Sequence, residues 1–300
     1  MRMLRRNLLS LLAGGLTGAV VRGRPAAADG VAARRMYVDG PFGQLHVSDA
    51  GPKASMQHPP LICFHQSPVS GAQFAMFQRE MAKTRRVLCP DTPGFGGSDA
   101  PPSPPTIEDY ARAISDVLPQ LGIAAGQVID VLGYHTGTLI AAELALSRPK
   151  LVRKVVFSGL ALFTPEELAR NRAGGGEGPR PLADPAYIAR YFAQQVVNGH
   201  AEISIPRRFE LFVERLRSGD RSWYGPAAVF AYDTEQRLKS LAQPALLLAM
   251  SGSLGENTRR AASVLPQATL VARPDLDGQA AWDSHPQEIA AIVNAFLDAS

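Results

Sequence analysis

The sequence predicts an α/β fold with a mostly parallel, eight-stranded sheet covered by helices on both faces. Short, almost continuous apolar runs alternate with segments of helical spacing, which is typical of strands buried on both faces and linked by helices. In the stretch 128–137, VIDVLGYHTG, an apolar run ends in a turn between two glycines and passes directly into a helical segment. The alternation stops near residue 163 and resumes near residue 233, which predicts an inserted helical cap.

The core strands are predicted from their apolar content and the helices from their periodicity. Alternation at Leu45 and Val47, with the turn residues 41–43, predicts an antiparallel hairpin at the start. Including that hairpin, the expected strands are 36–40, 44–50, 61–65, 86–90, 127–134, 152–159, 244–250 and 268–274. The expected helices are 72–83, 106–121, 137–148, 255–264 and 286–297. These elements define a core domain of residues 36–162 and 233–300.

Residues 163–232 are predicted to form a helical cap between the sixth and seventh strands. A loop rich in glycine and proline at 174–181 precedes two amphipathic helix candidates, near 185–197 and 205–217. The same helices could instead form a small bundle that extends the core, and the position of their apolar face separates the two alternatives. Charges in this segment are nearly balanced, so the sequence indicates no charge preference for a substrate.

The 300-residue chain is 46% hydrophobic and has a formal net charge of +4. Residues 1–28 contain five arginines and no acidic residue, which leaves a net charge of −1 for the remainder. The positive charge therefore belongs to the N-terminal segment, and a nucleic-acid-binding face has no support.

That N-terminal segment, 1–28, has the pattern of an export signal peptide. A basic start, a 14-residue apolar stretch from Leu8 to Val21 and an Ala26-x-Ala28 site follow one another. The run Arg5-Arg6-Asn7-Leu8-Leu9 fits the twin-arginine route. The apolar stretch is shorter than the ~20 residues that span a bilayer, which favours cleavage over a membrane anchor. We therefore expect a periplasmic or exported protein without membrane association after cleavage, or a cytoplasmic one if the leader is not functional.

Neither a metal nor a cofactor is predicted. Cys63 and Cys89 each lie inside an apolar run, so buried free thiols are expected. The chain has no cluster with metal-ligand spacing, no dinucleotide fingerprint and no phosphate loop.

Three motifs in this order make the sequence similar to the α/β-hydrolase superfamily, in the branch with a cap between the sixth and seventh strands. Gly133-Tyr134-His135-Thr136-Gly137 resembles the family's nucleophile elbow, G-x-S-x-G. Phe64-His65-Gln66-Ser67-Pro68 follows the third strand, where relatives show His-Gly. The segment 91–99, DTPGFGGSD, resembles a conserved family loop. The resemblance covers roughly residues 37–297.

At the catalytic positions the sequence departs from the family pattern. His135 stands where the family has a serine, aspartate or cysteine nucleophile. The position of the triad acid falls on Ser253, or on Glu256 if the loop is shifted, and the position of the triad histidine falls on Gln279. Asp277 is a further carboxylate that could rebuild part of a triad. The resemblance therefore does not imply the ordinary serine-hydrolase mechanism.

The resemblance implies an oxyanion hole made by the backbone N–H groups of Ser67 and Thr136, which needs no triad side chain. Histidine tolerates a positive φ better than most residues, so His135 can occupy the tip of the elbow. Its neutral imidazole could attack an acyl carbon, or remove a proton next to a carbonyl while the amides hold the enolate oxygen. The second route is favoured because Gln279 cannot act as the acid and base of deacylation.

Other residues receive supporting roles. His65 is expected to hydrogen-bond the loop below the site, and Asp91 to brace loops at the sheet edge. The Ser67 side chain is a lower-ranked nucleophile candidate, served by His135. The remaining expected neighbours of the tip are Gln66, Gly133, Tyr134 and Gly137.

The sequence thus predicts an enzyme that acts through His135 on a small, mostly apolar carbonyl compound, namely an ester, lactone, thioester or dicarbonyl. The alternative is a catalytically silent relative that binds a ligand or partner in the same pocket. The oligomeric state is left open.

Overall fold

The computed structural model describes residues 32–52, 58–173, 184–252 and 254–299. The predicted export signal, the loop at 174–181 and Ser253 lie outside the described residues, so the export signal stays a prediction. Among the helices that are described, none combines the length and the hydropathy needed to cross a membrane. Cys63 and Cys89 are buried free thiols, as predicted.

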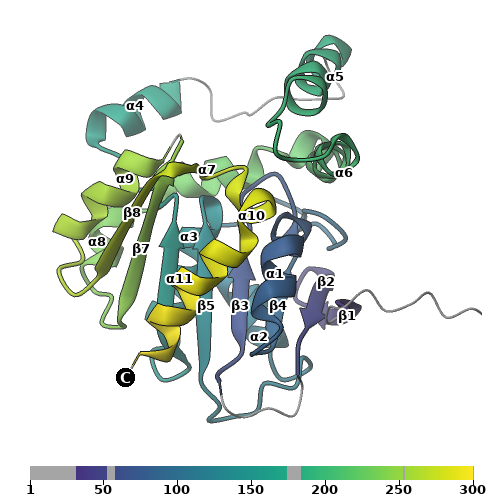
Figure 1. Cartoon of the computed structure of the whole chain (residues 1–300). Coiled ribbons are helices and arrows are strands. Elements are labelled where there is room, and N and C mark those ends of the chain that lie inside the picture. Colours follow the sequence, from purple (N-terminus) through teal and green to yellow (C-terminus); the bar gives the residue numbers. More distant parts are fainter. Residues whose placement is uncertain (1–31, 53–57, 174–183, 253, 300) are drawn as a thin grey trace, which may run out of the picture. The chain divides into compact units, whose positions relative to one another are not determined.

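Eight strands form one sheet in the order β1-β2-β4-β3-β5-β6-β7-β8. The hairpin of β1 (Arg34–Gly40) and β2 (Gly43–Ala50) is antiparallel, and β2 is antiparallel to β4 (Val87–Pro90). All other neighbouring strands are parallel (Figure 1). The parallel part of the sheet consists of β4 with β3 (Leu61–Phe64), β5 (Ile129–Tyr134), β6 (Val152–Ser158), β7 (Ala245–Ser251) and β8 (Thr269–Asp277). The predicted mostly parallel, eight-stranded sheet is confirmed.

Helices cover both faces of the sheet, because successive side chains of a strand point to opposite faces. Val131 of β5 belongs to one hydrophobic cluster and Leu132 to the other. The cluster around Leu132 is covered by α1 (Ala75–Met81), α10 (Ala281–Ser284) and α11 (Pro286–Asp298), together with η1 (Gly71–Phe74). The cluster around Val131 is covered by α2 (Ile107–Val117), α3 (Thr136–Ser147), α7 (Tyr224–Ala231), α8 (Thr234–Leu238) and η4 (Ala261–Ser263). The helix α9 (Gly255–Arg260) leads into η4.

The helical cap lies between β6 and β7, as predicted (Figure 1). Its predicted helices are α5 (Pro185–Phe192) with the π-helical turn η2 (Ala193–Val197), and α6 (Ile205–Leu216). The structure adds α4 (Pro165–Ala173), η3 (Gly219–Arg221) and α7 (Tyr224–Ala231). The added helices lack the apolar stripe that predicts an amphipathic helix, since α4 buries no residue and α7 is apolar over most of its length.

Two arginines of the cap fix α6 over the core. Arg207 donates to the carbonyl of Ala72 at 2.6 Å and to Asp283 at 2.9 Å. Arg217, just after α6, donates to the carbonyl of Gly96 at 3.0 Å. The apolar face of α6 is therefore held over loops at the carboxyl ends of the strands.

Candidate active site

The elbow, Gly133–Gly137, leaves a single residue between strand and helix. β5 ends at Tyr134, α3 begins at Thr136, and His135 between them has φ 49° and ψ −117°. Within the described parts of the chain it is the only residue other than glycine with a positive φ. Such a conformation costs of order 1–3 kcal/mol and persists only where its surroundings enforce it.

Three hydrogen bonds hold the strained tip in place. The N–H of His135 donates to the carbonyl of Ser158 at 3.2 Å. The carbonyl of His135 accepts from the N–H of Thr138 at 2.8 Å and from the Thr138 hydroxyl at 2.5 Å. The backbone at the tip is therefore fixed by the neighbouring strand and by the first turn of α3.

The two glycines of the elbow allow strand and helix to approach closely. A Cβ added to Gly133 would lie 2.2 Å from the carbonyl oxygen of Gly137. A Cβ added to Gly137 would lie 2.0 Å from the carbonyl oxygen of Phe64 in β3. Both contacts are with backbone atoms that cannot turn away, so only glycine fits at either position.

The imidazole of His135 is partly buried between two neighbours. It packs on the ring of Tyr134, with 4.2 Å between centroids. It also lies over Gly159, where an added Cβ would meet Cδ2 of the imidazole at 2.3 Å and Nε2 at 2.9 Å. Burial lowers the pKa of His135 to about 4, and the positive charge of Arg215 acts in the same direction. The imidazole is therefore neutral near pH 7.

A cavity of ≈10 Å³ lies beside the imidazole, at the carboxyl ends of β6, β7 and β8. The resemblance places the triad acid and base at this end of the sheet. The volume is about that of one water molecule. The Ser158 hydroxyl, which has no hydrogen-bond partner among the described residues, lies in its wall. The described wall contains no carboxylate and no second imidazole; besides His135, Tyr134 and Ser158 it consists of Gly159, Met250, Ser251, Gly252, Leu254, Gly255, Gly278 and Gln279.

The two carboxylates considered for a rebuilt triad do not contact His135. Glu256 has 80% of its side chain exposed and pairs with Arg259. Asp277 accepts hydrogen bonds from the two amides that follow it by two and three residues, at 2.8 and 3.1 Å, and lies 3.6 Å from Nε2 of His200. The described residues therefore hold no Ser-His-acid arrangement at the elbow.

The two residues of the expected oxyanion hole lie next to each other. The N–H of Ser67 donates a hydrogen bond to the side-chain Oγ1 of Thr136, with 3.4 Å between N and Oγ1. Thr136 is the first residue of α3, so its own N–H has no acceptor within the helix. The Ser67 side chain is directed towards α7, because a Cβ added to Gly225 would lie 2.1 Å from its Oγ. It forms no hydrogen bond with His135, which does not favour Ser67 as a nucleophile.

His65 holds the loop below the site. The side chain is fully buried. Nε2 accepts the N–H of Thr92 at 2.9 Å, and Nδ1 donates to the carbonyl of Gln66 at 2.8 Å. These bonds require the neutral imidazole, and burial lowers the pKa of His65. The geometry fits the structural role expected from the sequence.

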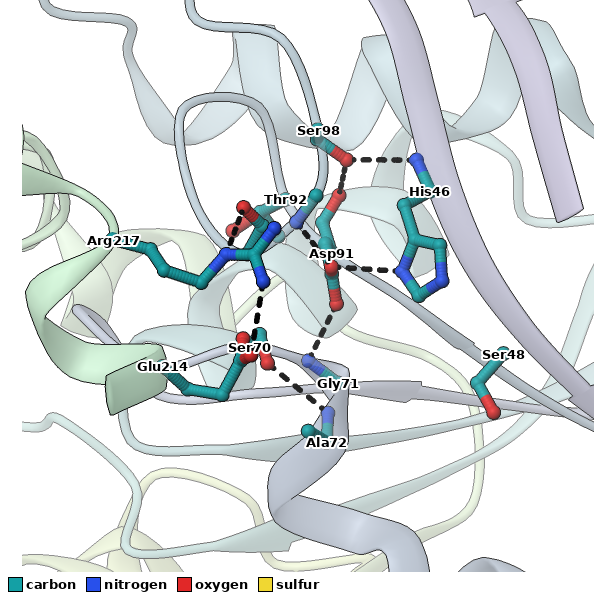
Figure 2. A network of polar contacts seen from close by, with 12 residues as sticks. His46, Ser48, Ser70, Gly71, Ala72, Asp91, Thr92, Ser98, Glu214 and Arg217 are labelled. Carbon is teal, nitrogen blue, oxygen red and sulfur yellow. Dashed lines mark hydrogen bonds and ion pairs between the residues drawn. The ribbon is translucent and has the colours of Figure 1, made fainter. Parts of the chain in front are cut away.

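Asp91 connects strand β2, the first residue of η1 and the loop that follows β4 (Figure 2). Its carboxylate accepts from Nδ1 of His46 at 2.9 Å and from the N–H groups of Gly71 and Gly97, each at 2.8 Å. Burial alone raises the pKa of Asp91, but the hydrogen bonds from His46 and from the amide of Gly97 outweigh it and lower the pKa below its ordinary value.

We expect Asp91→Asn to lower the free energy of unfolding by about 2 kcal/mol, since a buried charged acceptor of several hydrogen bonds is lost. The folded-state pKa of Asp91 is depressed, so its contribution is present above the ordinary pKa and is lost as the pH falls through the folded value. Urea unfolding at neutral and acidic pH would measure both effects. Asp275→Asn, at an exposed carboxylate, serves as the control and should change stability less. Equal stability of Asp91→Asn and wild type would contradict this role.

A second cavity of ≈60 Å³ lies between the core and the cap. The cap contributes Arg208, Leu211, Phe212 and Arg215, which are spaced i, i+3, i+4, i+7 on one face of α6. The apolar residues of this helix are visible in the sequence, but the nearly balanced charges of the cap gave no indication of a cationic site. The helical spacing of α6 alone could have shown that Arg208 and Arg215 lie on the same face as Leu211 and Phe212. The other lining residues are Gln66, Val69, Gln73, Tyr191, Gln195, His200, Ile203 and Gln279.

Comparison with known proteins identifies the family. The family model described as "alpha/beta hydrolase fold" matches residues 59–246, more than half of the chain. The chain belongs to the α/β-hydrolase fold family. The resemblance stated from the three motifs is thereby confirmed, and the elbow at 133–137 lies inside the matched region.

Three individual proteins similar to this chain share 20–28% sequence identity with it. A 2-hydroxy-6-oxononadienedioate/2-hydroxy-6-oxononatrienedioate hydrolase of Pseudomonas sp. is 28% identical over 204 residues, which cover 61% of this chain and 69% of the relative. A proline iminopeptidase of Heyndrickxia coagulans is 28% identical over 35% of this chain, and the match spans only 36% of that relative. An enol-lactonase structure from Burkholderia xenovorans has a TM-score of 0.69 at 20% identity, covering 88% of this chain and 100% of that one.

Proposed function

We propose that this α/β-hydrolase-family chain is an enzyme that acts on a small carbonyl compound with His135 as a neutral base. The observation that carries the proposal is the imidazole at the strained tip of the elbow, beside a cavity and without a hydrogen-bond partner among the described residues. Strain of this kind is typical of functional sites. A neutral imidazole accepts a proton without prior deprotonation, and its low pKa keeps it neutral at working pH.

The proposed reaction begins with transfer of a proton to the imidazole of His135. The proton comes from the carbon beside the carbonyl group or from a water molecule that attacks it. In either case the displaced electron pair ends on the carbonyl oxygen, and the amides of Ser67 and Thr136 stabilise its negative charge. The imidazolium then returns the proton to the product or leaving group. A covalent acyl-imidazole has less support, because Gln279 cannot provide the second base that its hydrolysis normally uses.

The substrate class is supported by the relatives. By their names, two of them are a 2-hydroxy-6-oxononadienedioate/2-hydroxy-6-oxononatrienedioate hydrolase and an enol-lactonase. Both names describe substrates with a carbonyl group that is conjugated or enolic. For this chain we propose an ester, lactone, thioester or dicarbonyl compound with an acidic hydrogen beside the carbonyl.

The test is a substrate panel with two readouts, applied to the purified protein. Hydrolysis of esters, lactones and thioesters is followed by product formation. Proton removal from dicarbonyl compounds is followed by NMR as hydrogen–deuterium exchange in heavy water. Turnover or exchange by wild type, and its loss in His135→Ala, would support the proposal. Equal rates for both proteins would remove His135 from the mechanism.

The pKa of His135 predicts the pH dependence of activity. Because the base is active only when neutral, kcat/KM should stay level above about pH 5 and fall as the pH drops through about 4. The positive charge of Arg215 on α6 also favours the neutral form of the imidazole. A pH–rate profile of the best substrate checks this, and an acidic limb near the ordinary histidine pKa of about 6.5 would contradict it.

A second candidate function is ligand binding without chemistry. It is favoured by the absence, among the described residues around the elbow, of an acid or a second base at the triad positions. Tight binding of a carbonyl compound with neither turnover nor deuterium exchange would support this function over catalysis.

A further inference from the structure

Arg215 is a partly buried cation that faces the larger cavity without an acidic partner among the described residues. Its guanidinium lies over the ring of Tyr191, with Cζ 5.1 Å from the ring centroid. Partial burial removes water from the guanidinium, which costs free energy. An anion or several hydrogen-bond acceptors would offset that cost.

Two other arginines, one in the first turn of α6 and one just after its end, have carboxylate partners. Arg207 pairs with Glu210 at 2.8 Å and with Asp283 at 2.9 Å. Arg217 pairs with Glu214 at 3.4 Å, an ion pair that Figure 2 shows beside the Asp91 network. The two acidic residues of α6 are therefore already paired on faces other than the one that carries Arg215.

Two further hydrogen-bond donors in the wall of this cavity have no acceptor in the described structure. Nε2 of Gln73 is buried and unpaired, and the side chain is only 4% exposed. Nε of Arg208 is likewise buried and unpaired, although its guanidinium also donates to the carbonyl of Gly199 at 2.8 Å. Buried donors without acceptors are unusual in folded proteins and call for a partner.

Asp277 is an acidic group that lies beside a residue of this cavity, His200, and it already accepts hydrogen bonds. It does not line the cavity. Its carboxylate accepts two backbone N–H groups and lies 3.6 Å from His200, which does line the cavity. The described wall therefore offers two arginines and several glutamine amides, and no carboxylate.

We infer that Arg215, with Arg208 and Gln73, binds a carboxylate group of the substrate in the cavity under α6. An ionised carboxylate has about four acceptor sites and matches the planar fork of a guanidinium. The cavity volume of ≈60 Å³ holds about four to six water molecules, so it accommodates this group rather than a whole substrate. Gln279 lines both cavities and connects the carboxylate site to the surroundings of His135.

The inference rests on the proposed function for the reacting end of the substrate and names its class, a small carbonyl compound that carries a carboxylate. Binding of the carboxylate requires no chemistry at His135. Failure of the carboxylate site and failure of the proposed reaction are therefore distinguishable by experiment.

The test is calorimetric titration of the purified protein with the dicarboxylates from malonate to adipate, each compared with its uncharged dimethyl ester. We expect wild type to bind at least one dicarboxylate more tightly than its ester. Arg215→Gln should weaken that binding by about 10- to 100-fold, the range for a charge-assisted hydrogen-bond pair, and should leave ester binding unchanged. Arg215→Lys should retain part of the affinity, since it keeps the charge without the planar fork.

Arg190→Gln is the matched control, because Arg190 lies on the cap with 67% of its side chain exposed. It should bind dicarboxylates as wild type does. Thermal unfolding of each variant establishes that the cap is intact. Three outcomes would overturn the inference: no binding of any dicarboxylate by wild type at millimolar concentration, equal affinity for acids and esters, or unchanged acid binding by Arg215→Gln. Dicarboxylate binding without turnover would uphold the site and count against the proposed reaction alone.

Discussion

His135→Ala is expected to lower kcat/KM by about 10²- to 10⁴-fold, the range for loss of a positioned general base. The variant removes the imidazole and leaves the glycines and oxyanion amides of the elbow unchanged. Because the tip has φ 49°, His135→Asn is the second variant, since asparagine also tolerates a positive φ. Steady-state kinetics on the best substrate measures both, and both should lose activity while retaining the unfolding midpoint of wild type within a few degrees.

His135→Ser distinguishes this account from a hidden serine mechanism. The variant restores the nucleophile that the family pattern expects, but Gln279 and the described wall of the small cavity supply no base to activate it. It should therefore be as inactive as His135→Ala. Activity equal to or above that of wild type would mean that an acid and base outside the described residues complete a triad, and that His135 is dispensable.

Gly137→Ala is expected to destabilise the protein by about 3 kcal/mol or more, because the new Cβ would overlap backbone atoms. It would lie 2.0 Å from the carbonyl oxygen of Phe64 and 2.9 Å from that of His65. Relief requires β3 and α3 to separate, which would also displace the loop that carries the Ser67 amide. Urea unfolding and circular dichroism measure the loss.

The control for this substitution is Gly126→Ala. Gly126 has φ +82° and no other atom within 4 Å of an added Cβ. Its alanine variant carries only the cost of a left-handed backbone, about 1–2 kcal/mol. If Gly137→Ala were no more destabilising than Gly126→Ala, the close approach of strand and helix would not be the reason for the glycine.

Much of the fold could be predicted because its signals are local. The apolar runs of β3 and β5 and the amphipathic spacing of α6 are visible in a few consecutive residues. The helices α4 and α7 were not predicted because neither shows a periodic apolar stripe; α4 buries no residue, and α7 is apolar over most of its length. The positive φ at His135 was expected from the resemblance to the family's elbow and from the tolerance of histidine for this conformation.

The surroundings of the site could not be predicted, because they depend on contacts between distant parts of the chain. Thr138 and Ser158 fix the tip through hydrogen bonds that no motif encodes. Gly159 supports the imidazole from the end of another strand. Arg215 faces the cavity because the cap folds back over the core. The net charge of the cap does not show this site, because the acidic residues of α6 pair with other arginines.

The central claim, that a neutral imidazole at the elbow is the reactive base, is tested most directly by NMR titration of His135 in labelled protein, assigned with His135→Asn, beside the pH–rate profile. The account predicts a neutral ring at about pH 6, a titration midpoint near 4, and an acidic limb of kcat/KM at that same pH. A ring that is protonated at about pH 6, or activity that falls at a pH unrelated to its titration, would contradict it.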